Sequence, residues 1–285
     1  MNIVMLDSTV GNDYSLLLGQ HLREQGVELA LVVTEDRNIS LPVTFTLFRW
    51  MPSKSKSVGK FRKGAGYLRY LLKVFTHVVK TRPQAIHYQF FRLPRLEFLF
   101  FCLLKRCGFR MFYTVHDIIP HEHSWPDLVW LKRVYQGATV LIAHSAHLKQ
   151  ELINRFQVPA DKIRIIPHGN FDFYLPPQPI CKADVRQILN IPQEAFVVLF
   201  FGFIRVYKGL DLLLAAMQNS VRDNSNLHLL LAGSFHSRTL QEQYTYQVRT
   251  FTPQENIHDY FDYIPAELVH RYFLALAFEP TRLEI

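Results

Sequence analysis

The chain has 285 residues, of which 49% are hydrophobic and 20% charged, with a formal net charge of +8 at pH 7, so it can bury the core of one large domain or two medium ones. Its three cysteines lack metal-type spacing, which argues against a disulfide framework or a zinc site and for a reducing compartment. No apolar run approaches the roughly 20 residues of a membrane span and no export signal follows Met1, so we expect a soluble, cytoplasmic protein.

The first elements are a strand, a turn, a helix and a second strand. Residues 3–8 and 27–34 are apolar runs typical of buried strands, and leucines at helical spacing lie between them. This start predicts a parallel sheet with helices on both faces. The first turn contains Gly11, Asn12 and Tyr14 but lacks the Gly-x-Gly-x-x-Gly pattern of dinucleotide-binding folds.

The same alternation of short strands and helices continues through the first half of the chain. Further strands are expected at residues 43–48, 85–89, 111–115, 139–143 and 162–166, and helices at 65–80, 93–107, 125–135 and 145–156. Ligands of such sheets bind outside the carboxyl ends of the strands. Side chains that directly follow a strand are therefore candidate site residues.

A basic segment lies between two of these strands. Residues 49–82 contain no acidic residue. The ten basic residues of this segment are Arg49, Lys54, Lys56, Lys60, Arg62, Lys63, Arg69, Lys73, Lys80 and Arg82. Such a segment is attracted to the phosphates of an anionic membrane surface, although a solvated loop that leads into a packed helix explains it equally well. We expect no nucleic-acid binding, because no recognition module accompanies the charge.

Titratable side chains are concentrated after residue 115. His116 and Asp117 follow the expected strand directly, and His121, Glu122 and His123 come shortly after them. These residue types bind metal ions, but His-Glu-x-x-His and paired cysteines are missing, so we expect no metal site. His116 is then either a ligand-binding histidine or a hydrogen-bonded histidine at a strand end.

The strongest ligand-binding signal lies in the second half of the chain. A buried strand at residues 197–201 ends at Gly202, Arg205 and Lys208 lie in the following loop, and Gly209 precedes a helix with one apolar face. Backbone N–H groups and the positive dipole end of a helix N-terminus bind a phosphate well when cations lie nearby. The alternative is an ordinary α/β turn with two solvated cations.

This segment resembles the donor site of retaining glycosyltransferases of family 4, in which a Gly-x-x-Arg-x-x-Lys-Gly turn precedes a Leu-Leu-x-Ala helix. The resemblance implies an α/β fold of GT-B type, with two Rossmann-like domains that face a cleft. The linker-like stretch at residues 171–179 places the boundary between an acceptor-side domain, 1–170, and a donor domain, 171–285.

The resemblance also implies roles for individual residues. Arg205 and Lys208 would bind the diphosphate of a nucleotide-sugar, and Lys208 is the firmer assignment because many members have an arginine where this chain has Phe203. His116, in a Val-His-Asp segment similar to that of some members, would contact a hydroxyl of the transferred sugar. The remaining cleft candidates, on the acceptor or phosphate side, are Gly11, Asn12, Tyr14, Asp117 and Gly169.

The last part of the chain matches the family only in part. Residues 227–232 read as the next strand, 238–250 as a helix, and 256–273 as a short strand followed by a helix. The Glu-x7-Glu motif that holds the donor sugar and the ribose in family 4 is missing. We therefore expect the second domain to be incomplete, as in a truncated or frameshifted product or one half of a split enzyme.

The resemblance implies transfer of a hexose from a nucleoside diphosphate sugar to a glycan or lipid-linked acceptor, with retention of configuration. No metal or other cofactor is required if Arg205 and Lys208 neutralise the leaving diphosphate. The basic segment would suit an acceptor at the inner face of the membrane. The rival hypothesis, favoured by the missing glutamates, is a catalytically silent fragment or partner subunit.

Overall fold

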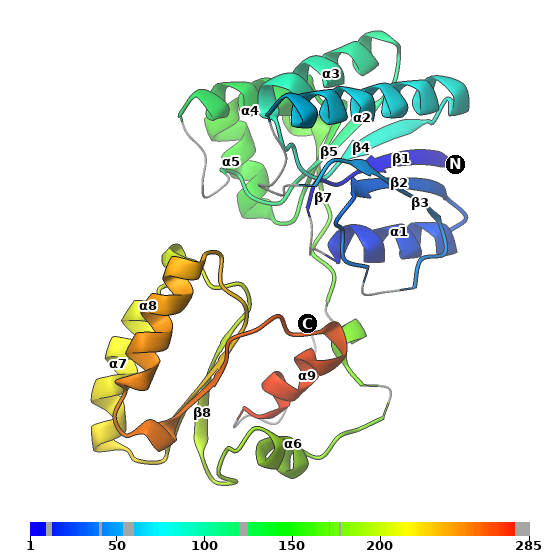
Figure 1. Cartoon of the computed structure of the whole chain (residues 1–285). Helices are drawn as coiled ribbons and strands as arrows, with labels where there is room; N and C mark the ends of the chain where they lie inside the picture. Colours follow the sequence, from blue (N-terminus) through cyan, green and yellow to red (C-terminus); the bar gives the residue numbers. More distant parts are fainter. Residues whose placement is uncertain are drawn as a thin grey trace. The chain divides into compact units, whose positions relative to one another are not determined.

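The computed structural model describes residues 1–9, 13–39, 42–53, 60–119, 125–170, 172–176 and 178–276. The chain divides into two compact units, Met1–Gly169 (unit 1) and Asn170–Ile285 (unit 2). Each unit is built around a parallel β-sheet with helices packed on it (Figure 1). Within the described part of the chain, no helix combines the length and apolarity needed to cross a membrane.

Unit 1 contains a seven-stranded sheet in the order β3-β2-β1-β4-β5-β6-β7, with every neighbouring pair parallel. Its strands are β1 (Asn2–Leu6), β2 (Glu28–Thr34), β3 (Thr46–Met51), β4 (Ala85–Tyr88), β5 (Met111–Val115), β6 (Val140–Ala143) and β7 (Ile163–Ile165). Its helices are α1 (Tyr14–Glu24), α2 (Lys60–Thr81), α3 (Pro94–Arg106), α4 (Trp125–Gly137) and α5 (Ala146–Phe156). Strands β2 and β3 lie on one side of β1, and β4 to β7 lie on its other side. The direction in which successive strands are added therefore reverses between β1 and β4, and sheets of this type bind ligands at such a point.

The strands alternate between two cores, as the two-residue period of a strand requires. In β1, Val4 and Leu6 pack in a core with residues of α2 to α5, whereas Ile3 and Met5 pack in a second core with Leu16 of α1. Figure 1 shows α1 on one face of the sheet and α2, α3 and α4 on the other. The expected doubly covered parallel sheet is confirmed.

Unit 2 contains a three-stranded parallel sheet in the order β10-β9-β8. Its elements are η2 (Asp172–Tyr174), α6 (Lys182–Ile188), β8 (Phe196–Phe201), η3 (Val206–Lys208), α7 (Leu210–Asp223), β9 (Leu227–Ala232), α8 (Arg238–Arg249), η4 (Gln254–Asn256), β10 (Ile257–Tyr260) and α9 (Ala266–Leu274). One core joins the sheet to α7 and α8, and the other joins it to α6 and α9 (Figure 1).

Three elements differ from the sequence-based expectation by more than two residues. Helix α2, expected at residues 65–80, begins earlier, at Lys60. The strand expected at residues 43–48 runs over Thr46–Met51, because β3 pairs with β2 in a register that matches Ala30 with Thr46 and Thr34 with Met51. Helix α6 was not predicted, since its seven residues are mostly polar. It is fixed by long-range contacts: Arg186 is buried and its guanidinium donates hydrogen bonds to the carbonyl of Ala275.

A buried ion pair organises the loop after β1. The Arg37 guanidinium lies 3.4 Å from the Asp7 carboxylate, and both side chains are almost completely buried. Asp7 also accepts hydrogen bonds from the hydroxyl of Ser15 and from the backbone N–H and hydroxyl of Thr9. Arg37 in turn donates to the carbonyl of Thr9 at 2.9 Å. These bonds connect the end of β1 to the start of α1 and to the loop after β2.

Candidate functional site

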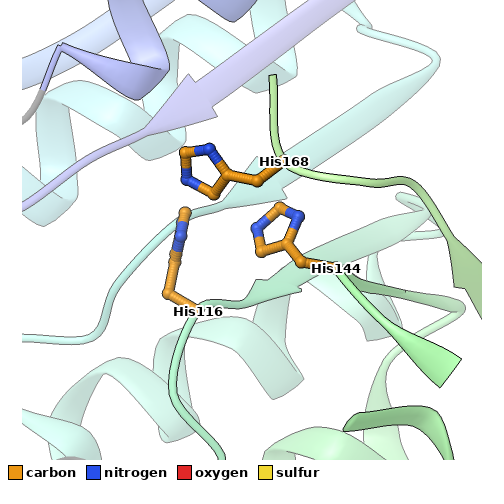
Figure 2. Close-up of side chains that lie close together, drawn as sticks. All are labelled: His116, His144 and His168. Carbon is orange, nitrogen blue, oxygen red and sulfur yellow. The ribbon is translucent and has the colours of Figure 1, made fainter. Parts of the chain in front are cut away.

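The carboxyl ends of three neighbouring strands of unit 1 each carry a histidine. His116 follows β5 directly, His144 follows β6 directly, and His168 lies shortly after β7 (Figure 2). One ring nitrogen of each lies within 4.8 Å of the others. The ring of Tyr14, from the start of α1, contacts all three, with centroid distances of 4.9 Å to His116, 5.4 Å to His144 and 5.0 Å to His168. Two expected site residues, His116 and Tyr14, therefore lie together.

His116 is held by two residues that follow β4. Its Nε2 lies 2.8 Å from Oε1 of Gln89, and its ring stacks on Phe90 with centroids 4.4 Å apart and an interplanar angle of 9°. The amide nitrogen of Gln89 lies 3.3 Å from Nε2 of His87, which itself contacts the hydroxyl of Thr114 at 2.7 Å. This buried polar chain orients Gln89 so that its oxygen faces His116.

Burial, and then the neighbouring histidines His144 and His168, lower the pKa of His116 to about 3. The imidazole is therefore neutral at neutral pH. Because the amide oxygen of Gln89 can only accept, Nε2 of His116 carries the hydrogen and Nδ1 carries the lone pair. His116 can thus accept a hydrogen bond from a hydroxyl group or bind a metal ion, but it does not carry positive charge.

The other expected residues of unit 1 contribute less to this cluster. Asp117 is exposed, and its main-chain carbonyl lies 3.5 Å from the hydroxyl of Tyr135. Gly169 is exposed, and apart from Gly169 and its two chain neighbours no atom of the described residues lies within 4 Å of the position that a Cβ would occupy there. Gly11 and Asn12 lie outside the described residues, as do His121, Glu122 and His123.

In unit 2 the loops after β8 and β9 are bonded to each other. Gly202, with φ of +107°, donates its N–H to the carbonyl of Ala232 at 2.9 Å. The N–H of Ile204 donates to the carbonyl of Ser234 at 2.8 Å, and the N–H of His236 donates back to the carbonyl of Ile204 at 3.1 Å. The loop that carries the expected anion-binding residues is therefore anchored to its neighbour along its first half.

Gly233 is the point where these loops are closest. A Cβ at this position would lie 1.9 Å from the carbonyl oxygen of Gly202, and the φ of Gly233 is +143°. Neither the contact nor the backbone conformation tolerates a side chain, so the carboxyl ends of β8 and β9 require glycine here.

We expect Gly233→Ala to lower the free energy of unfolding of unit 2, because the new methyl group must displace the backbone of Gly202. This displacement should cost about 2 kcal/mol in addition to the strain of an alanine at positive φ. Chemical denaturation measures this difference. Gly26→Ala is the matched control, since Gly26 also has a positive φ, +75°, but has open space around its Cβ position. Equal losses in the two variants would contradict the close approach of the two loops.

Both cationic side chains of the loop, Arg205 and Lys208, lie against other residues of the same loop. The guanidinium carbon of Arg205 lies 5.3 Å from the ring centroid of Phe203. The ammonium of Lys208 lies 3.4 Å from the position that a Cβ of Gly202 would occupy, so this side chain folds back over Gly202. Burial and the charge of Arg205 lower the pKa of Lys208. An anionic ligand would stabilise the charged form of Lys208.

Helix α7 begins at Leu210, two residues after Lys208. Gly209, with φ of +69°, is the N-cap residue, and its carbonyl accepts the N–H of Leu213 at 3.0 Å. The backbone N–H groups of residues 210–212 precede the first intrahelical bond and lie at the positive end of the helix dipole. Gly202, Arg205, Lys208 and Gly209 thus form one cationic loop with the chemistry of an anion site.

Sequence reasoning missed His144, His168 and Gln89. A signal for all three was present, since each lies at or shortly after the end of an expected strand, as His116 does. Strands β5, β6 and β7 are neighbours in the sheet, so residues that follow them meet at one edge.

Comparison with known proteins begins with sequence. The profile described as Glycosyltransferase Family 4 matches residues 12–169. A D-inositol 3-phosphate glycosyltransferase of Streptosporangium roseum is 23% identical over 236 residues, which cover 76% of this chain and 53% of that protein. One of Streptomyces scabiei is 33% identical over 226 residues, which cover 72% of this chain and 49% of that protein. The chain spans about half the length of these curated relatives.

Solved structures resemble the whole described chain. Sucrose-phosphate synthase from Thermosynechococcus elongatus matches with a TM-score of 0.73 and 17% identity, covering 96% of this chain and 73% of that one. The Anabaena protein HepE, crystallised with UDP and glucose, matches with a TM-score of 0.70 and 14% identity, covering 97% and 72%. At these identities the likeness concerns the fold, and it confirms the expected α/β fold of GT-B type.

Proposed function

The chain belongs to glycosyltransferase family 4. From this premise we propose that it transfers a hexose from a nucleoside diphosphate sugar to a glycan or lipid-linked acceptor. In this proposal the transfer retains the configuration of the sugar and serves polysaccharide or glycolipid synthesis. The observation that carries the proposal is the cationic loop of unit 2, in which Lys208 folds over Gly202 beside the N-terminus of α7. The phosphates of a nucleoside diphosphate suit the charge and the N–H donors of such a loop.

In this mechanism the loop stabilises the leaving group. As the bond between the sugar and the diphosphate breaks, negative charge accumulates on the phosphate oxygens. Lys208, Arg205 and the N–H groups at the start of α7 neutralise that charge without reorganising, which is often the largest contribution to catalysis. No metal ion is needed for this step.

The proposed role of His116 is to position the sugar. Its neutral ring accepts a hydrogen bond from a sugar hydroxyl at Nδ1, while Gln89 holds Nε2. Residues 1–170 form the acceptor side and residues 171–285 the donor side of the proposed enzyme. On the acceptor side, the proposed cleft residues are Gly11, Asn12, Tyr14, Asp117 and Gly169.

Peripheral contact with an anionic membrane through residues 49–82 is part of the proposal. Helix α2 exposes Leu68 and Leu72, at 66% and 60%, and Arg69 is exposed between them. Apolar side chains interleaved with basic ones are typical of surfaces that rest on anionic lipid. Lys54 and Lys56, which belong to the same basic segment, lie outside the described residues.

Calorimetric titration of the purified chain with UDP, GDP and their hexose derivatives tests the donor site without requiring the acceptor. We expect one molecule of a diphosphate to bind per chain, with UDP preferred, because related folds have been crystallised with UDP bound. UMP should bind at least about tenfold more weakly, since it lacks the second phosphate that Lys208 would contact. A folded chain that binds none of these nucleotides would refute the proposal.

The second candidate is a catalytically silent partner subunit that binds the donor without transferring it. These 285 residues contain no pair of glutamates with the Glu-x7-Glu spacing that the resemblance assigns to holding the donor sugar. Release of UDP from a bound donor distinguishes the two, because the silent subunit would bind UDP-sugar but release no UDP with any acceptor.

A further inference from the structure

We propose that His116, His144 and His168 form a binding site for one divalent transition-metal ion of the zinc type. Figure 2 shows the three rings turned toward a common space from the loops that follow β5, β6 and β7. One nitrogen of each ring lies within 4.8 Å of the other two. The proposal departs from the sequence-based expectation of no metal site, which considered ligands from a single segment only.

Each of the three rings has one nitrogen in contact with a protein oxygen. These contacts join His116 Nε2 to Gln89 Oε1 (2.8 Å), His144 Nδ1 to the carbonyl of Ile166 (2.9 Å) and His168 Nδ1 to the carbonyl of Gly169 (3.3 Å). Amide oxygens only accept hydrogen bonds, so these nitrogens carry hydrogen and the opposite nitrogen of each ring carries the lone pair. Metal-binding histidines are held in this way, by a carbonyl or carboxylate on the second nitrogen.

His144 gives a second, independent indication of a ligand. Its Nε2, the nitrogen that carries the lone pair, is buried and has no hydrogen-bond partner among the described residues. Buried polar atoms are nearly always paired with protein, water or an ion, so this nitrogen is open to a partner from outside the chain. A metal ion held also by His116 and His168 would supply that partner.

The donor set selects the type of ion. Three imidazoles suit Zn²⁺, Co²⁺, Ni²⁺ and Cu²⁺, whereas Mg²⁺ and Ca²⁺ prefer oxygen ligands. Zinc–nitrogen bonds of about 2.0–2.1 Å place tetrahedral ligands about 3.3 Å apart, so the rings must approach one another by on the order of 1 Å. His168 is exposed and therefore can move. Three protein ligands leave a fourth position open to water or to an oxygen of a small molecule.

One consequence rests on the proposed function, although metal binding itself does not. Nδ1 of His116 is the nitrogen assigned to a sugar hydroxyl, and it is also the nitrogen that would bind the metal. The two ligands therefore compete, and zinc should inhibit sugar transfer.

Titration of the chelator-treated chain with Co²⁺, followed by its visible absorption, and with Zn²⁺ by calorimetry tests the site at neutral pH. We expect one ion per chain and the intense absorption of tetrahedral Co²⁺. His144→Ala and His168→Ala should each weaken binding by at least about 100-fold. Gln89→Leu removes the contact to Nε2 of His116, together with the contact to His87, and should weaken binding by about 10–100-fold. His168 is exposed, so this variant tests the site without disturbing the core.

His147→Ala is the matched control, because His147 is an exposed histidine at the start of α5 outside the cluster, and the substitution should leave binding unchanged. Equal affinity in wild type, His144→Ala and His168→Ala, or binding without a fixed stoichiometry, would overturn the proposal. Titration of the same variants with UDP separates the two proposals: UDP binding without metal binding refutes the metal site alone, and metal binding without UDP binding refutes the donor site alone.

Discussion

Lys208→Ala should weaken binding of the nucleoside diphosphate sugar about tenfold or more, since a hydrogen bond to a charged group contributes about 1.5–3 kcal/mol. Transfer should suffer more, with kcat lower by about 10²–10³, because the charge on the diphosphate grows as the sugar leaves and the ammonium stabilises that charge most in the transition state. Calorimetry with UDP-sugar and a UDP-release assay measure the two effects separately.

One control keeps the charge at position 208, and the other removes a charge at the far end of α7. Lys208→Arg keeps the charge and should retain most of the affinity, although the guanidinium is larger. Arg222→Ala removes one positive charge at the opposite end of α7, where it is exposed, and should leave the affinity unchanged. If Lys208→Ala and Arg222→Ala bind the donor equally well, the loop is not the diphosphate site and the mechanism fails.

Short apolar strands were the elements that sequence predicted best. Strands β5 and β9 have the predicted bounds, 111–115 and 227–232, because buried parallel strands are continuous apolar runs bounded by polar residues or glycine. Helix α6 was not predicted, because its fold depends on contacts of Arg186 with the distant Ala275 rather than on its own pattern. The shift of β3 has the same origin, since its register is set by β2.

The candidate site residues were also predicted only in part, because some of them are close in sequence and others meet only in the fold. The residues of the cationic loop are close in sequence, so their spacing alone indicated an anion site. The histidine cluster combines residues from three separate loops, and it becomes visible only when β5, β6 and β7 are known to be adjacent. His144 and His168 carry the same strand-end signal as His116, but only the order of the strands shows that the three histidines meet.

Arg37→Met should lower the free energy of unfolding of unit 1 by about 3–5 kcal/mol, because it leaves the carboxylate of Asp7 buried without its cation. Arg37 and Asp7 are 2% and 0% exposed, so water cannot replace the lost partner without opening the loop. Urea denaturation followed by tryptophan fluorescence reports this change, since all three tryptophans of the chain lie in unit 1.

The double variant Asp7→Asn/Arg37→Met shows how much of the loss in stability comes from the unpaired charge of Asp7 and how much from lost packing. Asparagine keeps the shape of Asp7 and can still accept the N–H of Thr9, so the double variant should lose about 0.5–3 kcal/mol less than the sum of the two single variants. Glu24→Gln breaks an exposed pair with His21 in the same unit and should change stability little, because exposed pairs are weak. Additive losses would mean that Asp7 and Arg37 do not interact. We expect the two substitutions to be coupled, because Asp7 and Arg37 share Thr9 and Ser15 as hydrogen-bond partners. Removing either ion leaves Thr9 and Ser15 with one partner fewer and leaves the other ion without its opposite charge.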